Sequence, residues 1–216
     1  MTISHPKNDQ SPFSMNRRRV LQMIAAAGPA VALMSSGISA GESPVVSKGY
    51  GKDVDMHNPQ VTWTKILTED ELKNVVVLCD IVIPEDEKSP SASALDIPDF
   101  VNEWVSAPYP TQEKDKETIL GGIAYLNKQA NSLYGKNQFH ELVSAEQESV
   151  FDALAVSVSE NKAEPEIELF FQQLVYIVAG GYYTTEVGSA DLGYVGNVPI
   201  PTFDGPPKEI KDILGL

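Results

Sequence analysis

The chain has one cysteine, three histidines and, after its first 19 residues, no arginine. Because the arginine guanidinium binds phosphate with two parallel hydrogen bonds, its absence argues against nucleic-acid binding. The single cysteine, Cys79, excludes a disulfide within the chain. Its place on the apolar face of an expected helix favours a buried thiol. The alternative is an intersubunit thiol, since an unpaired cysteine in an oxidising compartment invites an intermolecular disulfide.

Sequence patterns typical of catalytic and cofactor sites are also missing. The chain lacks G-x-S-x-G, H-E-x-x-H, G-x-G-x-x-G, a phosphate-binding loop and the C-x-x-C-H pattern of haem attachment. His57 lies in an irregular segment, and His140 lies at an expected helix start, where a structural or solvated role is the simpler interpretation. Asp80 and Asp86 are the only acids tied to apolar neighbours, and nothing marks an inward-facing pair of carboxyls. We therefore expect no catalytic, cofactor-binding or metal-binding residue in this chain.

The charge balance is strongly acidic, with 16 basic and 30 acidic residues. The first 40 residues hold four of the basic residues and one of the acidic ones. The remainder therefore has 12 basic and 29 acidic residues, a net charge of −17. Nucleic acids and anionic membrane surfaces repel a protein with this negative charge. Solubility alone explains the acidic excess without a specific partner.

Residues 1–40 are typical of an export signal. The segment Asn16 to Gln22 (NRRRVLQ) resembles a twin-arginine motif, with Arg17 and Arg18 as the pair that the translocon recognises. An apolar run from Val20 to Met34 follows, and cleavage is expected after Ala40. The run is short for a membrane span, and an uncleaved anchor is the alternative. We expect the remaining chain to be periplasmic.

Apolar residues recur at three- and four-residue steps, which predicts several amphipathic helices. Capping boxes at Thr68 to Glu71 and Ser144 to Gln147 indicate two helix starts, and Pro84 and Gly135 indicate two helix ends. Gly121-Gly122, inside a long helical pattern, indicates close packing or a break. No period-two alternation supports a strand. The predicted helices cover about 68–83, 97–105, 111–134, 144–158 and 164–179.

These patterns predict an all-α fold. We expect one compact, bundle-like domain over residues 61–197, with an irregular arm (41–60) before it and a proline-rich tail (198–216) after it. The 176 residues that follow the leader are enough to bury about 70% of the unfolded surface, so the fold needs no disulfide.

The last predicted helix leads into a segment rich in tyrosine and glycine. Gly180 and Gly181 are expected to end the helix, and Asp191 is expected to accept backbone hydrogen bonds in a turn between Gly188 and Gly196. Aromatic rings on a stiff loop suit a contact surface, because each ring covers much area at little entropic cost. A loop packed onto its own domain is the alternative. The expected partner contacts are Tyr182, Tyr183, Leu192, Tyr194, Pro199 and Pro201.

The run from Phe170 to Asn197, FFQQLVYIVAGGYYTTEVGSADLGYVGN, resembles the C-terminal signature of the gluconate 2-dehydrogenase subunit 3 family. Ile83 to Ala92 is similar to the family's earlier IPxD…SPxA segment, and Phe139 to Gln147 is a weaker match. The resemblance implies a cofactor-free small subunit of a membrane-associated, FAD-dependent sugar or polyol dehydrogenase. Its partner would be a flavoprotein of the glucose–methanol–choline type, and a multihaem cytochrome c subunit often completes such complexes.

The sequence therefore predicts a non-catalytic accessory subunit that binds, stabilises and escorts a flavoprotein. Twin-arginine export carries folded cargo, usually because a cofactor is inserted before transit. This chain would supply the signal, and its partner would supply FAD. The alternatives are an independent periplasmic enzyme, a ligand-binding or scaffold protein, and an export chaperone that leaves the mature complex. The sugar or polyol substrate is not encoded in this chain.

Overall fold

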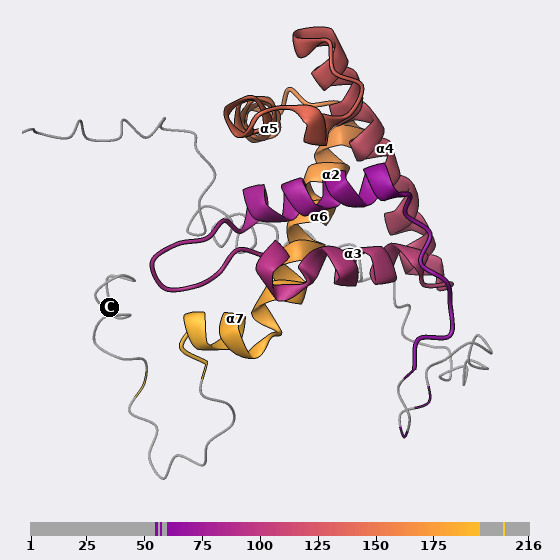
Figure 1. Cartoon of the computed structure of the whole chain (residues 1–216), viewed down its shortest axis with the longest axis vertical. Coiled ribbons are helices and arrows are strands. Elements are labelled where there is room, and N and C mark those ends of the chain that lie inside the picture. The colour runs from indigo at the N-terminus through magenta and orange to yellow at the C-terminus, as the bar shows by residue number, and fades with distance from the viewer. Residues whose placement is uncertain (1–54, 56, 58–59, 195–204, 206–216) are drawn as a thin grey trace, which may run out of the picture.

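The structure, a computed structural model, describes residues 55, 57, 60–194 and 205 of the chain (Figure 1). Its described part is helical and has no strand, which confirms the predicted all-α class. None of the described helices is both long and apolar enough to cross a membrane. The expected leader, most of the arm and nearly all of the tail lie outside the described residues. The elements are α2 (Glu69–Val82), η1 (Ser93–Leu95), α3 (Ile97–Ser106), α4 (Pro110–Tyr134), η2 (Phe139–Glu141), α5 (Ser144–Ser159), α6 (Pro165–Tyr183) and α7 (Glu186–Asp191).

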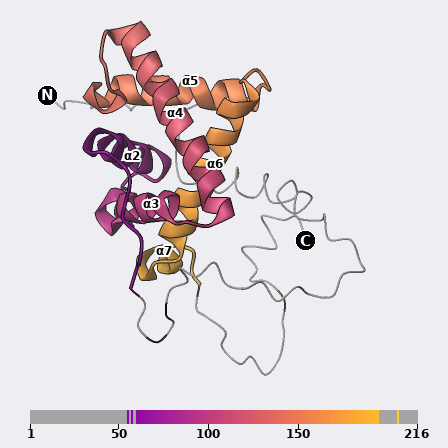
Figure 2. The same cartoon turned by 90° about the vertical axis from the view of Figure 1, so that its right-hand side faces the viewer.

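Helix α6 is the centre of the fold, and α2, α3, α4, α5 and α7 all contact it. Figures 1 and 2 show α2 and α3 lying one beside the other across α6, while α4 crosses it. Helix α5 lies near the upper end of α6 and crosses the upper part of α4, whose last turns extend beyond it. This burial follows from the apolar periodicity of α6. The helix has a wide apolar face, and exposing that face to water would be unfavourable. The buried residues of α6 are Phe170, Phe171, Leu174, Val175, Ile177, Val178, Ala179, Gly181 and Tyr182.

A missing side chain lets α4 and α6 pack closely. A Cβ atom at Gly122 would overlap the ring of Phe170, whereas one at Gly121 would meet no atom within 4 Å. Helix α4 is continuous through both glycines. The sequence indicated either close packing or a helix break at Gly121-Gly122. Close packing is correct for Gly122, and the helix is not broken.

Local hydrogen bonds set the helix ends largely as the sequence indicates. The Thr68–Glu71 capping box of α2 is present. Gly135 ends α4 with a φ of +68°, a conformation that glycine adopts without a steric penalty. The predicted box at Ser144 is wrong by one position. Val143 is the N-cap residue, and Glu146 accepts its backbone N–H at 3.2 Å. Gln147 instead donates to the carbonyl of Leu142 at 2.9 Å.

We predict that alanine affects the stability of the protein differently at the two neighbouring glycines of α4. Gly122→Ala should lower the free energy of unfolding by about 1–3 kcal/mol, because the Phe170 ring must move. Gly121→Ala is the matched control. It should be neutral or stabilise by up to about 1 kcal/mol, because alanine has the higher helix propensity. Urea unfolding of both variants measures the difference. Equal stabilities would contradict close α4–α6 packing.

Candidate functional site

The two tyrosines expected on an exposed loop lie in the last turn of α6. Gly180 and Gly181 do not end this helix, which continues to Tyr183. Gly181 is needed for packing, since a Cβ there would lie 2.6 Å from the ring of Phe100. Thr184 follows as the C-cap residue, and its hydroxyl donates to the carbonyls of Gly180 and Gly181, each at 2.9 Å.

Consecutive side chains on a helix point about 100° apart, so Tyr182 and Tyr183 differ in how deeply they are buried. Tyr182 is fully buried, and its hydroxyl donates to the carbonyl of Pro90 at 2.8 Å. Its expected place on an exposed contact surface is therefore wrong. Tyr183 is half-buried, and its ring meets the Tyr182 ring edge-on at a centroid distance of 5.2 Å. Tyr182 therefore anchors the end of α6 to the segment around Pro90.

The expected glycine-punctuated turn forms a short helix, α7. Thr185 caps it by accepting the backbone N–H of Gly188 at 3.0 Å. Gly188 packs so tightly that a Cβ there would overlap the backbone carbonyl of Tyr182. After α7 the chain exposes two of the expected contact residues, Leu192 (51% exposed) and Tyr194 (63% exposed). Pro199 and Pro201 lie outside the described residues.

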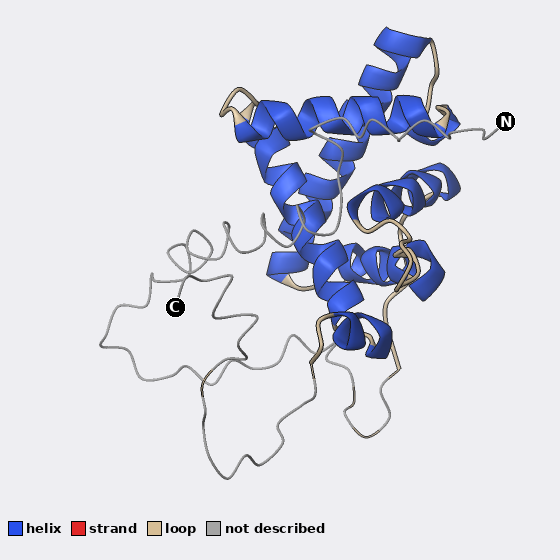
Figure 3. Cartoon of the chain, turned by 90° about the vertical axis from the view of Figure 1, so that its left-hand side faces the viewer, coloured by secondary structure: helices blue, strands red, loops and turns tan. Residues whose placement is uncertain are grey.

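The loop 84–92 lies against the α6–α7 turn, at the same end of the molecule (Figures 1 and 3). The Ser89 hydroxyl donates to Oδ1 of Asp191 at 3.0 Å, although 102 residues separate them. Asp191 thus accepts a side-chain donor from another segment, in addition to any local turn contact. Asp86 shapes the loop by accepting the backbone N–H groups of Lys88 and Ser89 at 2.8 and 2.9 Å. We call residues 84–92 and 182–194 together the C-terminal corner.

The acids next to apolar neighbours have structural partners. Asp80 accepts the backbone N–H and the hydroxyl of Ser93 at 2.8 and 2.7 Å, which holds η1 against α2. Asp115, which no sequence pattern singles out, is 8% exposed and accepts the indole N–H of Trp104 at 2.8 Å. Nothing in the local sequence marks this contact, which depends on how α3 meets α4. Among the described residues, no group of three or more His, Cys, Asp or Glu side chains could hold a metal ion.

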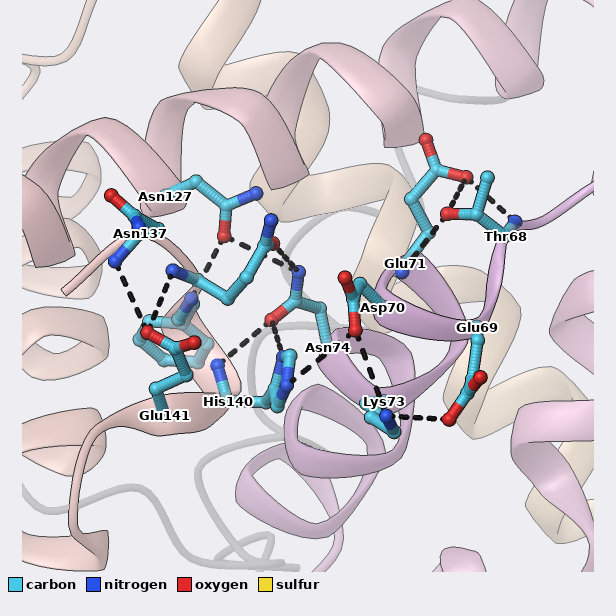
Figure 4. A network of polar contacts seen from close by, with 12 residues as sticks. Thr68, Glu69, Asp70, Glu71, Lys73, Asn74, Asn127, Asn137, His140 and Glu141 are labelled. Atoms are coloured by element: carbon cyan, nitrogen blue, oxygen red, sulfur yellow. Dashed lines mark hydrogen bonds and ion pairs between the residues drawn. The ribbon is translucent and has the colours of Figure 1, made fainter.

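A polar network joins α2 to the segment between α4 and α5 (Figure 4). Its centre is Asn74, a buried residue that no sequence pattern singles out. The Asn74 amide nitrogen donates to Asn127 at 3.3 Å and to Gln138 at 3.2 Å. Its oxygen accepts the backbone N–H of His140 at 2.8 Å and lies 3.2 Å from Nδ1 of the same residue. His140 thus has the contacts of a structural residue, as expected.

Cys79 lies in the core with 0% exposure. Burial raises the pKa of its thiol far above the usual value, and the charge of neighbouring Asp80 adds to the effect. The thiol therefore stays protonated and has no access to another chain. The alternative of an intersubunit thiol is wrong for this fold, because a disulfide would require the core to open.

These features define a compact all-α protein in which two distant segments form one corner with exposed apolar side chains. The chain belongs to the gluconate 2-dehydrogenase subunit 3 family, whose profile matches residues 69–205 and so includes the whole C-terminal corner. No curated protein and no solved structure matched the chain. Membership places it among the subunits of a dehydrogenase complex that has a separate catalytic subunit, in an accessory rather than a catalytic role.

We predict that Tyr182→Phe lowers the free energy of unfolding by about 1 kcal/mol, because it removes a buried hydrogen bond to Pro90. Tyr176→Phe is the matched control. This tyrosine lies on the same helix but is 55% exposed, so water replaces its hydroxyl contacts and stability should not change. Chemical denaturation measures both variants. An unchanged Tyr182→Phe protein would show that the Pro90 contact does not hold the corner together.

We also predict that Cys79 reacts with a maleimide only after unfolding. The native protein should stay unlabelled over hours at pH 8, and the protein in 6 M guanidinium should label completely, because only the exposed thiolate reacts. Mass spectrometry of the intact chain gives the labelled fraction. Rapid labelling of the native chain, or a Cys79 cross-link on a non-reducing gel, would contradict the buried position.

Proposed function

We propose that this chain is the non-catalytic small subunit of an FAD-dependent sugar or polyol dehydrogenase, and that it binds, stabilises and exports the catalytic flavoprotein. Its membership of the subunit 3 family over residues 69–205 is the observation that carries the proposal. We further propose a flavoprotein of the glucose–methanol–choline type, which would hold the FAD, and a multihaem cytochrome c as a third subunit. This chain itself would bind no cofactor.

The exposed side chains of the C-terminal corner support a docking role. Leu192 and Tyr194 are more than half exposed, and Val187 is 38% exposed. Burial of such apolar side chains at an interface is favourable because it removes apolar surface from water, and tyrosine is among the residues that most often dominate binding energy. Tyr182 and Gly188 would contribute indirectly, by fixing the direction of α7. We propose that Tyr183, Pro199 and Pro201 extend the same surface.

The export step would depend on the leader of this chain. Arg17 and Arg18 lie in the segment that resembles a twin-arginine motif. A flavoprotein that folds around FAD in the cytoplasm needs a route for folded cargo, and a bound small subunit would provide the signal. The complex would then act on the periplasmic side of the membrane, to which its partner subunits would attach it.

We predict that Arg17→Lys combined with Arg18→Lys leaves both this chain and the flavoprotein in the cytoplasm. Arg19→Lys is the matched control, since it makes the same chemical change at the variable position of the motif and should leave export intact. Cell fractionation, with flavin absorbance to follow the partner, measures the distribution of both proteins.

The outcomes separate the proposal from its alternatives. Export of the flavoprotein despite the double substitution would overturn the escort role. A flavoprotein that is exported but does not co-purify with this chain from the periplasm would indicate a transient chaperone. Sugar turnover by the purified chain alone would indicate an independent enzyme.

A further inference from the structure

One face of α6 is exposed to solvent and carries no charge. We call it the α6 strip. Each of its residues lies three or four positions from another member, which places them on one side of the helix. No acidic or basic residue occurs from Leu169 to Thr185, a run of 17 residues. The strip consists of the exposed residues Leu169, Gln172, Tyr176 and Gly180 and the half-buried residues Gln173 and Tyr183, of which Tyr183 also packs against the core.

The neutrality of the strip is unusual for this chain. The solvent-facing side of α4 carries Lys114, Glu117 and Lys128, and that of α2 carries Glu69 and Lys73. Exposed helix positions normally take charged residues, which are soluble and favour the helix. Core packing does not explain the exception, because the buried side of α6 is formed by other residues. Leu169 is 52% exposed and Tyr176 is 55% exposed, so both present apolar surface to water.

Acidic residues lie beyond both ends of the strip. Glu164, Glu166 and Glu168 precede it, and Glu186 and Asp191 follow it. Glu168 is half-buried and accepts the Gln172 amide N–H at 2.9 Å, and the other four are exposed. A neutral centre with charged flanks matches the usual anatomy of a protein interface, in which charged residues are depleted at the core and polar groups form the rim. A complementary partner would therefore offer an apolar groove flanked by lysine or arginine.

We propose that the α6 strip is the centre of the interface with the catalytic subunit of the dehydrogenase complex, an inference that rests on the proposed function. Tyr176 and Leu169, two turns apart, are the anchors. Gln172 and Gln173 can satisfy polar groups of the partner, and Gly180, whose Cβ would meet open space, allows close approach. A second copy of this chain is a poor occupant, because pairing two strongly acidic bodies brings like charges together.

The strip and the C-terminal corner form one continuous docking surface. The strip runs about 21 Å along the helix, from Leu169 to Tyr183. A stable interface needs about 800 Å² on each partner, more than one helix face provides. Tyr183 is the last residue of α6 and belongs to the corner, and α7 packs against this end of the helix. The catalytic subunit would therefore contact α6 and α7 together, with the strip at the centre.

A charge-insertion pair tests the assignment in the full-length chain. In the strip variant, Leu169→Glu is combined with Tyr176→Glu. The control combines Leu133→Glu with Tyr134→Glu, which makes the same changes at exposed residues near the end of α4 (61% and 37% exposed). Each tagged chain is co-expressed with the catalytic subunit, and the flavin absorbance that co-purifies is measured. We expect the strip variant to retain at least about tenfold less flavoprotein than the control, which should match the wild type.

The outcomes distinguish the inference from the proposed function. If the wild type retains no flavoprotein, the proposed function fails and the inference fails with it. If the wild type and the strip variant bind equally, or both variants lose binding equally, the interface is elsewhere and the proposed function stands. Thermal unfolding and sedimentation of the isolated chains complete the test. A strip variant with a lower melting temperature, or a wild-type dimer that the strip variant abolishes, would assign the strip to this chain itself and overturn the inference.

Discussion

The burial of α6 is the constraint on which the rest of the structure depends. This helix has apolar residues around most of its circumference, and no single neighbour can cover so wide a face. Helices α2, α3, α4 and α5 together do so, and glycines allow the closest approach of α3 and α4. Gly122 admits the Phe170 ring, and Gly181 lies under the Phe100 ring. Each of these contacts joins α6 to a different helix, so losing either would loosen the packing around the whole core.

The same helix also organises the C-terminal corner. Because its last turn buries Tyr182, the hydroxyl of that residue reaches Pro90 in a segment far away in sequence. The contact holds the loop 84–92 beside α7, where Ser89 donates to Asp191. The two segments that carry the clearest family resemblance are thus parts of one structure, held by a few long-range hydrogen bonds. Leu192 and Tyr194 project from a corner that the core itself has positioned.

The sequence predicted the helices well, because their signals are local. Periodicity and caps lie within one element. The exposure of Leu192 and Tyr194 is compatible with the contact surface that was expected of a tyrosine- and glycine-rich segment. Errors arose where a distant residue decides the outcome. Gly180-Gly181 resembles a helix end until the Phe100 ring is placed against it. The absence of charged residues from Leu169 to Thr185 is visible in the sequence. That some of these residues form an exposed face becomes clear only when the buried positions of α6 are known.

An interface on the outer face of α6 would link docking to folding. The inner face of the helix belongs to the core, so the anchors Leu169 and Tyr176 are correctly placed only when the core has formed. A partner that binds the folded chain alone shifts its folding equilibrium toward the native state, in proportion to the logarithm of the partner concentration relative to Kd. By the same linkage, a change in the α4–α6 packing that weakens folding also weakens capture of the partner, although the residues changed lie in the core. A small subunit built in this way would present its docking surface to a catalytic subunit only when it is folded.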